Sequence, residues 1–179
     1  MEMSRDEDAR QITAPIRGRG AASRVAGRFE RRELRGEDDG WGSVYADLDG
    51  TPKPATTVTD ERARSIISRN RSPDIAFSQS VNPYRGCEHG CVYCFARPSH
   101  AYLDLSPGLD FETRITAKPD APRLLAAEIG KRGYAVAPIA FGTNTDPYQP
   151  AEAKLRIMRG CLQVLHDWNH PVSLVTRGQ

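Results

Sequence analysis

Apolar and polar positions follow regular periods in the second half of the chain, and these periods predict strands. The largely apolar run 75–81 is followed by Asn82 and Pro83, so we expect a strand that ends there. Residues 111–118 alternate between less polar and more polar side chains, which is the period of a strand with one exposed face. The run 136–141 is apolar throughout, as is typical of a strand buried on both faces.

Two further segments have the period of an amphipathic helix. The first begins at Asp120, carries Pro122 in its first turn and ends at Gly133. The second spans 151–168, where apolar residues recur at steps of three and four. A last core strand is expected at 172–176. Strands that alternate with helices predict an α/β fold with parallel strands, whose right-handed crossovers bring the loops after the strands to one edge.

The first part of the chain lacks such periods. Residues 1–40 mix Arg with Asp and Glu and hold few apolar side chains, which predicts a disordered, solvated tail. Within it, the Arg-Gly-Arg-Gly run at 17–20 is a candidate contact for nucleic acid, although neighbouring carboxylates cancel its field. Residues 41–74 are polar and rich in turn formers, so we expect an extended segment there. The folded core is therefore expected at 75–179.

Composition limits the class of protein. The chain has 179 residues, 39% of them hydrophobic, which suits one domain and excludes a large two-domain enzyme. Its 25 Lys and Arg against 23 Asp and Glu leave a net charge of +2. No apolar run approaches the roughly 20 residues that cross a bilayer, and the first residues lack the apolar core of a signal peptide. We therefore expect a cytoplasmic protein that makes no membrane contact.

Three of the four cysteines stand within eight residues, at Cys87, Cys91 and Cys94. In a reducing compartment, thiols at this density point to metal or redox chemistry before disulfides. Thiolates are soft donors that suit zinc and iron-sulfur clusters, and Gly86 and Gly90 allow the backbone to wrap closely around a metal. Three thiols leave one ligand missing from the usual set of four.

The spacing Cys-x₃-Cys-x₂-Cys, with the aromatic Tyr93 just before the last Cys, resembles the signature loop of radical SAM enzymes. The neighbouring residues 82–86 and 95–100, together with the later run 143–150, resemble the branch related to spore photoproduct lyase. The resemblance extends over about residues 60 to 177. Members of this branch are mostly uncharacterised, so the resemblance implies a cofactor much more strongly than a substrate.

The resemblance implies a [4Fe-4S] cluster on Cys87, Cys91 and Cys94. Its fourth iron would be chelated by the amino and carboxylate groups of S-adenosylmethionine (SAM). An electron from the reduced cluster would then cleave the sulfonium to methionine and a 5′-deoxyadenosyl radical that abstracts hydrogen from a substrate. An external donor of the flavodoxin or ferredoxin type is implied as well. The substrate is unknown, and a nucleic-acid lesion is one candidate by analogy with the branch.

The same resemblance implies residues that contact SAM. Tyr93 would lie beside the adenine, where its ring offers area for stacking, and the alternative is that it packs against the barrel wall. Asn144, Thr145 and Asp146 would lie at the position where family members bind the methionyl amino group. The family's more frequent Gly-Gly-Glu run is missing here, and the alternative is a turn that precedes the next helix. No catalytic residue is assigned.

The fold implied is the N-terminal half of a partial (β/α)₆ TIM-like barrel with parallel strands. Only about three strand-helix units are present, so the chain looks truncated after the third strand. A fragment that binds a cluster without turnover is therefore one alternative function.

Zinc is the other alternative. His89 or His100 could complete a Cys₃His tetrahedron, as in a zinc-stabilised module that binds nucleic acid. Arg85 and Arg97 are expected either to grip the SAM carboxylate or a substrate phosphate, or to serve as ion-pair partners. Cys161 lies on the apolar face of the predicted helix at 151–168, so we expect it in the core.

Overall fold

The computed structural model describes residues 18–21 and 55–178, which form a mixed α/β structure. Its strands are β1 (Thr57–Asp60), β2 (Ile67–Arg69), β3 (Gln79–Val81), β4 (Tyr84–Arg85), β5 (Arg114–Ala117), β6 (Ile139–Phe141) and β7 (Val172–Leu174). Its helices are the 3₁₀ helix η2 (Arg97–Leu103) and the α-helices α2 (Leu109–Thr113), α3 (Ala121–Ile129), α4 (Glu152–Leu155) and α5 (Ile157–Asp167).

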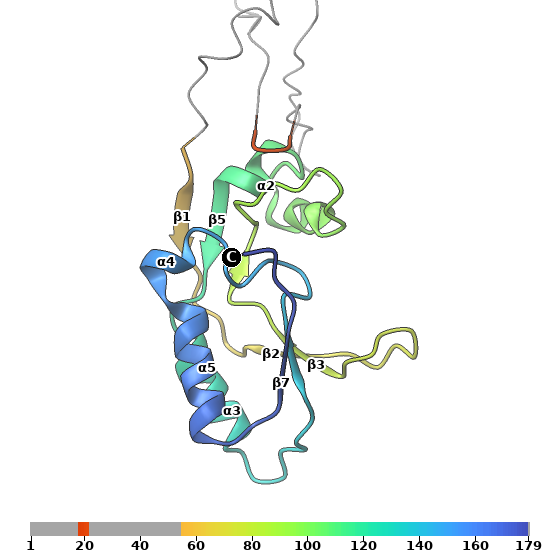
Figure 1. Cartoon of the computed structure of the whole chain (residues 1–179), viewed down its shortest axis with the longest axis vertical. Helices are drawn as coiled ribbons and strands as arrows, with labels where there is room; N and C mark the ends of the chain where they lie inside the picture. Colours follow the sequence, from red (N-terminus) through yellow and green to blue (C-terminus); the bar gives the residue numbers. More distant parts are fainter. Residues whose placement is uncertain (1–17, 22–54, 179) are drawn as a thin grey trace, which may run out of the picture.

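The strands form two small mixed sheets, which follow one another along the long axis of the molecule (Figure 1). One sheet has the order β1-β5-β4, in which β5 is parallel to β1 and antiparallel to β4. The other has the order β2-β3-β6-β7. Its last three strands are parallel, and β2 runs antiparallel at the edge. The expected parallel strands are therefore β3, β6 and β7.

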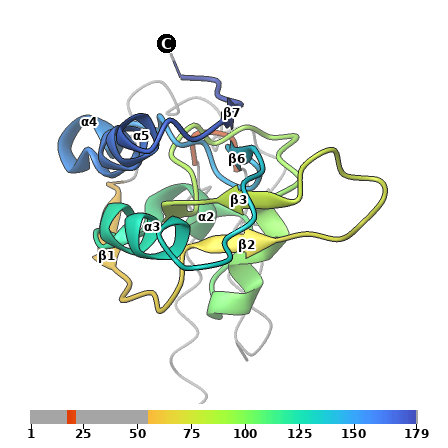
Figure 2. The same cartoon turned by 90° about the horizontal axis from the view of Figure 1, so that it is seen from below.

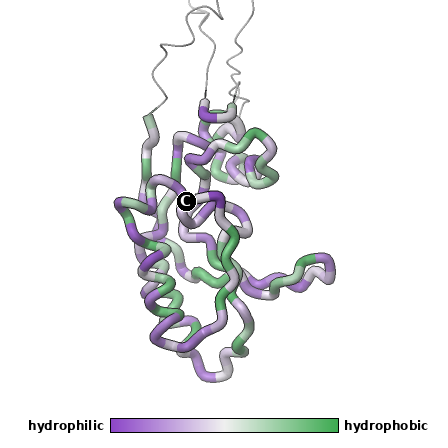
Figure 3. The backbone as a smooth tube through the Cα atoms, in the orientation of Figure 1, coloured by the Kyte–Doolittle hydropathy of each residue, from purple (hydrophilic) through white to green (hydrophobic). Residues whose placement is uncertain are grey.

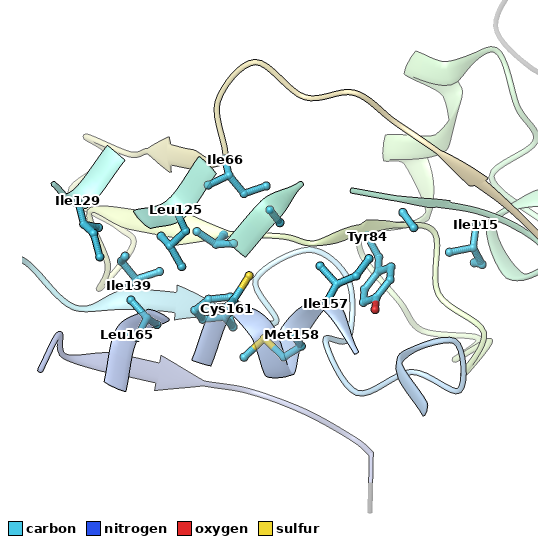
Figure 4. Packing of buried hydrophobic residues seen from close by; sticks show 14 residues of the cluster. Ile66, Tyr84, Ile115, Leu125, Ile129, Ile139, Ile157, Met158, Cys161 and Leu165 are labelled. Carbon is cyan, nitrogen blue, oxygen red and sulfur yellow. The ribbon is translucent and has the colours of Figure 1, made fainter. Parts of the chain in front are cut away.

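The core lies between the four-stranded sheet and the helices α3 and α5, which lie on the same side of that sheet (Figure 2). Leu125 of α3, Ile139 of β6 and Met158 of α5 are fully buried and lie among the packed side chains of Figure 4. Cys161 is also fully buried there, as predicted. Green and purple segments recur along the turns of α5 in Figure 3, and the buried residues of α3 and α5 recur at steps of three and four, so each helix turns one stripe toward the sheet.

The single strand expected at 111–118 is wrong in its first half, where α2 takes the place of a strand. Thr113 Oγ1 donates to the Leu109 carbonyl oxygen at 2.8 Å, a bond that belongs to a helical turn. The period misled because it assigned Glu112 to solvent, whereas the Glu112 side chain is fully buried. The remaining strand, β5, pairs with β1 and not with β6.

The continuous helix expected at 151–168 is interrupted. Arg156 has φ +53°, in the left-handed region, and separates α4 from α5. The carboxylate of Glu152 accepts hydrogen bonds from the backbone N–H groups of Met158 and Arg159, each at 3.0 Å. It thereby satisfies donors at the start of α5 that a continuous helix would pair internally.

Several boundaries also differ from the predictions. The helix expected to end at Gly133 ends at Ile129, and β3 and β6 occupy only the last three residues of their apolar runs. β7 is not a core strand, since its side chains are exposed at the sheet edge. The described part of the segment 41–74, expected to be polar and extended, contains the short strands β1 and β2.

No closed barrel forms among the described residues, and the six-unit barrel stays a prediction. Within the same residues, no helix combines the length and the apolar composition needed to span a membrane. Most of the expected tail 1–40 lies outside the described residues, apart from 18–21.

Candidate metal centre

Two consecutive tight turns shape the cysteine loop. The N–H of Gly90 donates to the Cys87 carbonyl oxygen at 3.3 Å, and the N–H of Cys94 donates to that of Cys91 at 3.2 Å. Gly86 and Gly90 have φ values of +76° and +61°, as the expected close wrapping requires. Each turn therefore starts at a cysteine, which places the thiols at the corners of the loop.

The three thiols line a single cavity of about 230 Å³, which we call the thiol cavity. Cys87, Cys91 and Cys94 line it from the cysteine loop on one wall, and Gly142, residues 144–146 and residues 175–177 line it from the other wall. The first wall follows β3 and β4, and the second follows the carboxyl ends of β6 and β7. The prediction that the cysteine loop and the Asn144 loop lie at the same sheet edge is thus confirmed. All three thiols are free of disulfides.

Gln149, in the loop after β6, holds the cysteine loop and was missed by sequence reasoning. Its Oε1 accepts a hydrogen bond from the N–H of Glu88 at 3.0 Å, and its Nε2 donates to the Gly86 carbonyl oxygen at 3.2 Å. Gln149 is 1% exposed, so both bonds form away from water. These contacts bracket Cys87, and no local pattern announces them because the partners lie about sixty residues apart in the sequence.

Cys87 is the most enclosed of the three thiols. Burial raises the pKa of its thiol to about 11, although hydrogen bonds from the backbone of His89 and Asp146 act in the opposite direction. Cys91 has a different surrounding, since Arg177 Nη1 lies 2.9 Å from its sulfur. One thiol is therefore buried and protonated at neutral pH, and another faces a guanidinium group.

Arg97 holds the cysteine loop through hydrogen bonds to its backbone. Its guanidinium group donates to the carbonyl oxygens of Gly90 and Cys91, both at 3.0 Å, and to Glu112 Oε1 at 2.6 Å. It also lies over the ring of Phe111, 5.4 Å from the centroid. Of the two roles left open for this arginine, the structure therefore shows the ion-pair role.

Arg85 also forms an ion pair within the fold. Its guanidinium group binds both carboxylate oxygens of Glu61, at 2.7 and 3.1 Å, and lowers the pKa of that carboxyl group. This ion pair joins β4 to the segment after β1 and lies outside the thiol cavity.

A piece of the N-terminal segment packs against the back of the cysteine loop. Arg19 Nη1 donates to the Glu112 carbonyl oxygen at 2.5 Å, and its Nη2 donates to Thr56 Oγ1 at 2.7 Å. The N–H of Gly20 donates to Glu112 Oε2 at 3.0 Å. A Cβ on Gly20 would lie 1.7 Å from the Gly90 carbonyl oxygen, so only glycine fits. Within the expected tail, residues 18–21 therefore contact the cysteine loop.

Tyr93 lines the thiol cavity and is 79% exposed, so it does not pack against a wall of the fold. Phe95, which is equally exposed, lines the same cavity. Both rings are open to a ligand, and contact of Tyr93 with an adenine stays a prediction.

Asn144, Thr145 and Asp146 also line the thiol cavity. Thr145 Oγ1 is already engaged, because it donates to the Tyr84 carbonyl oxygen at 2.9 Å. Asp146 accepts hydrogen bonds from the N–H of Tyr148 at 2.8 Å and from the N–H of Arg177 at 2.6 Å. These contacts match the alternative in which the residues shape a turn, and binding of an amino group stays a prediction.

The two candidate histidines lie in different places. His89 lines the thiol cavity, and its buried Nε2 has no hydrogen-bond partner among the described residues, although Asp146 Oδ2 lies 3.5 Å away. His100 is fully buried against Phe111, with its Nε2 3.0 Å from the Arg114 carbonyl oxygen, and does not line the cavity. Only His89 therefore remains as a candidate fourth ligand for zinc.

The donor set suits a soft metal centre, since three thiols and an imidazole nitrogen without a hydrogen-bond partner line one cavity. These side chains do not surround one common point, however. Across residues 18–21 and 55–178, no three His, Cys, Asp or Glu side chains are grouped closely enough to hold a metal ion. Binding of a metal or cluster would require the exposed part of the cysteine loop to close on it.

The chain is similar to uncharacterized mycobacterial proteins. Over 112 residues it is 43% identical to the uncharacterized protein Rv2578c of Mycobacterium tuberculosis and to the uncharacterized protein Mb2609c of Mycobacterium bovis. The match covers 61% of this chain and 33% of each relative, so the chain spans about a third of their length. No family model matches the chain, and no solved structure does.

Proposed function

We propose that this chain is the cluster-binding part of a radical SAM enzyme. The observation that carries the proposal is the thiol cavity, where three thiols from one eight-residue loop face the loop after β6. The cavity lies at the carboxyl ends of parallel strands, the edge at which α/β folds bind their ligands. The fourth cysteine, Cys161, is buried in the core and cannot complete a Cys₄ set.

Cys87, Cys91 and Cys94 would hold a [4Fe-4S] cluster whose fourth iron is left for SAM. When bound, this cluster supplies one electron that cleaves the SAM sulfonium and so starts hydrogen abstraction from the substrate. The chain's own residues would bind the cluster and SAM and orient them. Cys87 must give up its proton on binding, because the thiolate is the ligand. Gln149 holds the backbone on both sides of Cys87, and Arg97 holds the backbone at Gly90 and Cys91.

Residues from both walls of the thiol cavity would hold SAM. Tyr93 offers an exposed ring for the adenine. Asn144 and the carboxylate of Asp146 are acceptors of the kind that an amino group requires. Asp146 already accepts backbone hydrogen bonds from Tyr148 and Arg177, which fix the direction of its carboxylate.

The remaining parts of the proposal follow from the resemblance. The parallel strands β3, β6 and β7, with α3 and α5 on one side, would be the first units of a partial (β/α)₆ barrel. A flavodoxin- or ferredoxin-like donor would reduce the cluster, and the substrate would lie near the open end of the cavity.

Anaerobic reconstitution with iron and sulfide tests the proposal. We expect about four irons with matching sulfide per chain. Changing any one of Cys87, Cys91 or Cys94 to Ala should reduce the bound iron to less than about half, because two thiols do not hold the cluster. Cys161→Ala is the matched control and should load like the parent chain, since that thiol lies in the core.

Zinc is the competing outcome, because His89 shares the cavity with the three thiols. One zinc per chain, no iron after reconstitution, and loss of the zinc in His89→Ala would contradict a radical SAM function. Circular dichroism of each metal-free variant separates loss of a ligand from loss of the fold.

A further inference from the structure

A second cavity, of about 730 Å³, adjoins the thiol cavity, and we call it the arginine cavity. It is lined by residues 148–150, by Glu152, Ala153, Arg156 and Arg159, and by Thr176 and Gly178 after β7. His89 and Thr176 line both cavities, so a ligand in one lies next to a ligand in the other. Its volume is in the range of sites that hold small organic ligands.

Two guanidinium groups give the arginine cavity its charge. Arg156 and Arg159 line it and are exposed. Neither forms an ion pair with a carboxylate in the described part of the chain, in contrast to Arg85 and Arg97. Arginines that are already paired shape the fold, whereas unpaired guanidinium groups at a cavity leave their donors for a ligand.

Glu152 contributes one negative charge against these two guanidinium groups, and it is only 7% exposed, so the cavity keeps a positive balance. Glu152 accepts a hydrogen bond from the Tyr84 hydroxyl and from the N–H groups of Met158 and Arg159. These hydrogen bonds occupy the backbone N–H groups of Met158 and Arg159 at the start of α5. An anion in the cavity would therefore be bound by the guanidinium groups and not by the helix end. The left-handed conformation of Arg156 places that residue at the break between α4 and α5.

The rest of the wall suits the organic part of a ligand. Tyr148 is 39% exposed and lines the cavity beside Pro150. Its position is fixed by the hydrogen bond from its N–H to Asp146, which belongs to the thiol cavity. A planar ring such as a base can stack on a tyrosine of this kind.

We propose that the arginine cavity binds a phosphate-bearing ligand, with the phosphate on Arg156 and Arg159 and the organic part against Tyr148. The planar guanidinium fork matches two phosphate oxygens at once. As a statement about the substrate, the inference rests on the proposed function, because the ligand would extend toward the thiol cavity. Binding itself requires neither iron nor SAM.

Calorimetric titration of the metal-free chain tests the proposal with four probes: thymidine monophosphate, thymidine, inorganic phosphate and acetate. We expect thymidine monophosphate to bind most tightly, and thymidine and acetate to bind at least about tenfold more weakly. The double variant Arg156→Gln, Arg159→Gln should lose at least about tenfold in affinity for thymidine monophosphate. The control variant Arg62→Gln, Arg64→Gln removes two exposed guanidinium groups that do not line the cavity and should bind like the parent.

Tyr148→Ala should weaken binding of thymidine monophosphate and leave inorganic phosphate unchanged. Equal binding by the double variant and its control, equal binding of thymidine and its monophosphate, or binding of neither phosphate probe would overturn the proposal. The Arg156, Arg159 double variant should load iron like the parent, since neither residue lines the thiol cavity. Failure of phosphate binding with normal iron loading would thus reject this inference alone.

Discussion

At the scale of single residues, the three thiols of the candidate centre are not equivalent. Cys87 is buried and its pKa is raised, whereas the sulfur of Cys91 accepts a hydrogen bond from Arg177. Metal uptake at neutral pH must therefore release a proton from Cys87. The buried thiol costs more to ionise in the absence of a metal and is better shielded from water once a metal is bound.

The raised pKa of Cys87 predicts how the metal-free chain reacts with iodoacetamide. Only the thiolate reacts, so alkylation of Cys87 should accelerate about tenfold per pH unit and level off near pH 11. In urea the plateau should return to near pH 9, the usual value for the thiol. Peptide mass spectrometry measures both curves, and a plateau near pH 9 in the folded chain would contradict the burial of this thiol.

The same shift has a consequence for stability. Because folding raises the pKa of Cys87, the protonated thiol contributes stability that is fully present below about pH 9. This contribution is lost as the pH rises toward 11, so the free energy of unfolding of the metal-free chain should fall across that interval. Urea denaturation at pH 8 and pH 11 measures it, and Cys87→Ala should reduce the difference.

Sequence reasoning located these thiols and missed the residues that hold them. Spacing alone singled out Cys87, Cys91 and Cys94 as candidate ligands, because they stand close together in one loop. Gln149 and Glu112 have no such signal, since each acts on partners that lie far away in the sequence. A buried Gln or Glu is indistinguishable from an exposed one until the fold brings its partner close.

At the scale of elements, the cysteine loop is clamped from three directions. α2 supplies Glu112, the loop after β6 supplies Gln149, and the short segment 18–21 covers the back of the loop. Glu112 connects two of these clamps, because its carboxylate accepts from Arg97 and from the N–H of Gly20. The segment 18–21 is therefore part of the support of the candidate centre.

Gly20→Ala tests that support. The added Cβ would overlap the Gly90 carbonyl oxygen, so residues 18–21 should detach from the cysteine loop. We expect the amide of residue 20 to lose its protection from hydrogen exchange, and the chain to lose about 1–3 kcal/mol of stability because buried Glu112 loses a donor. Gly133→Ala is the control: its φ of +81° disfavours alanine, so it should also lower the stability, but an added Cβ there meets no atom within 4 Å and the amide of residue 20 should stay protected. Unchanged protection in Gly20→Ala would contradict the docking of this segment.

Periodicity correctly predicted the elements that bury a continuous stripe of apolar side chains. It failed where charged side chains are buried. α3, α5 and the parallel strands β3 and β6 lie within the predicted ranges. The strand expected over 111–113 is a helix because Glu112 faces inward to Arg97. Hydropathy counts every Glu as a solvent-facing residue, and so it cannot detect a carboxylate that is paired inside the fold.

At the scale of the whole molecule, the two sheets and the loops between them place the candidate centre. Three parallel strands point their carboxyl ends toward the thiol cavity, and the arginine cavity lies beside it. The order of strands along the chain predicted this shared edge, as parallel strands with right-handed crossovers require. The pairing of β5 with β1 could not be predicted, because it joins two segments that share no local pattern.

Electron paramagnetic resonance of the reconstituted, reduced chain, recorded with and without SAM, tests the central claim most directly. A cluster held by Cys87, Cys91 and Cys94 with one open iron should give a signal of a reduced [4Fe-4S] centre that changes when SAM is added. A chain that carries no iron after reconstitution, or a cluster signal that SAM leaves unchanged, would contradict the account.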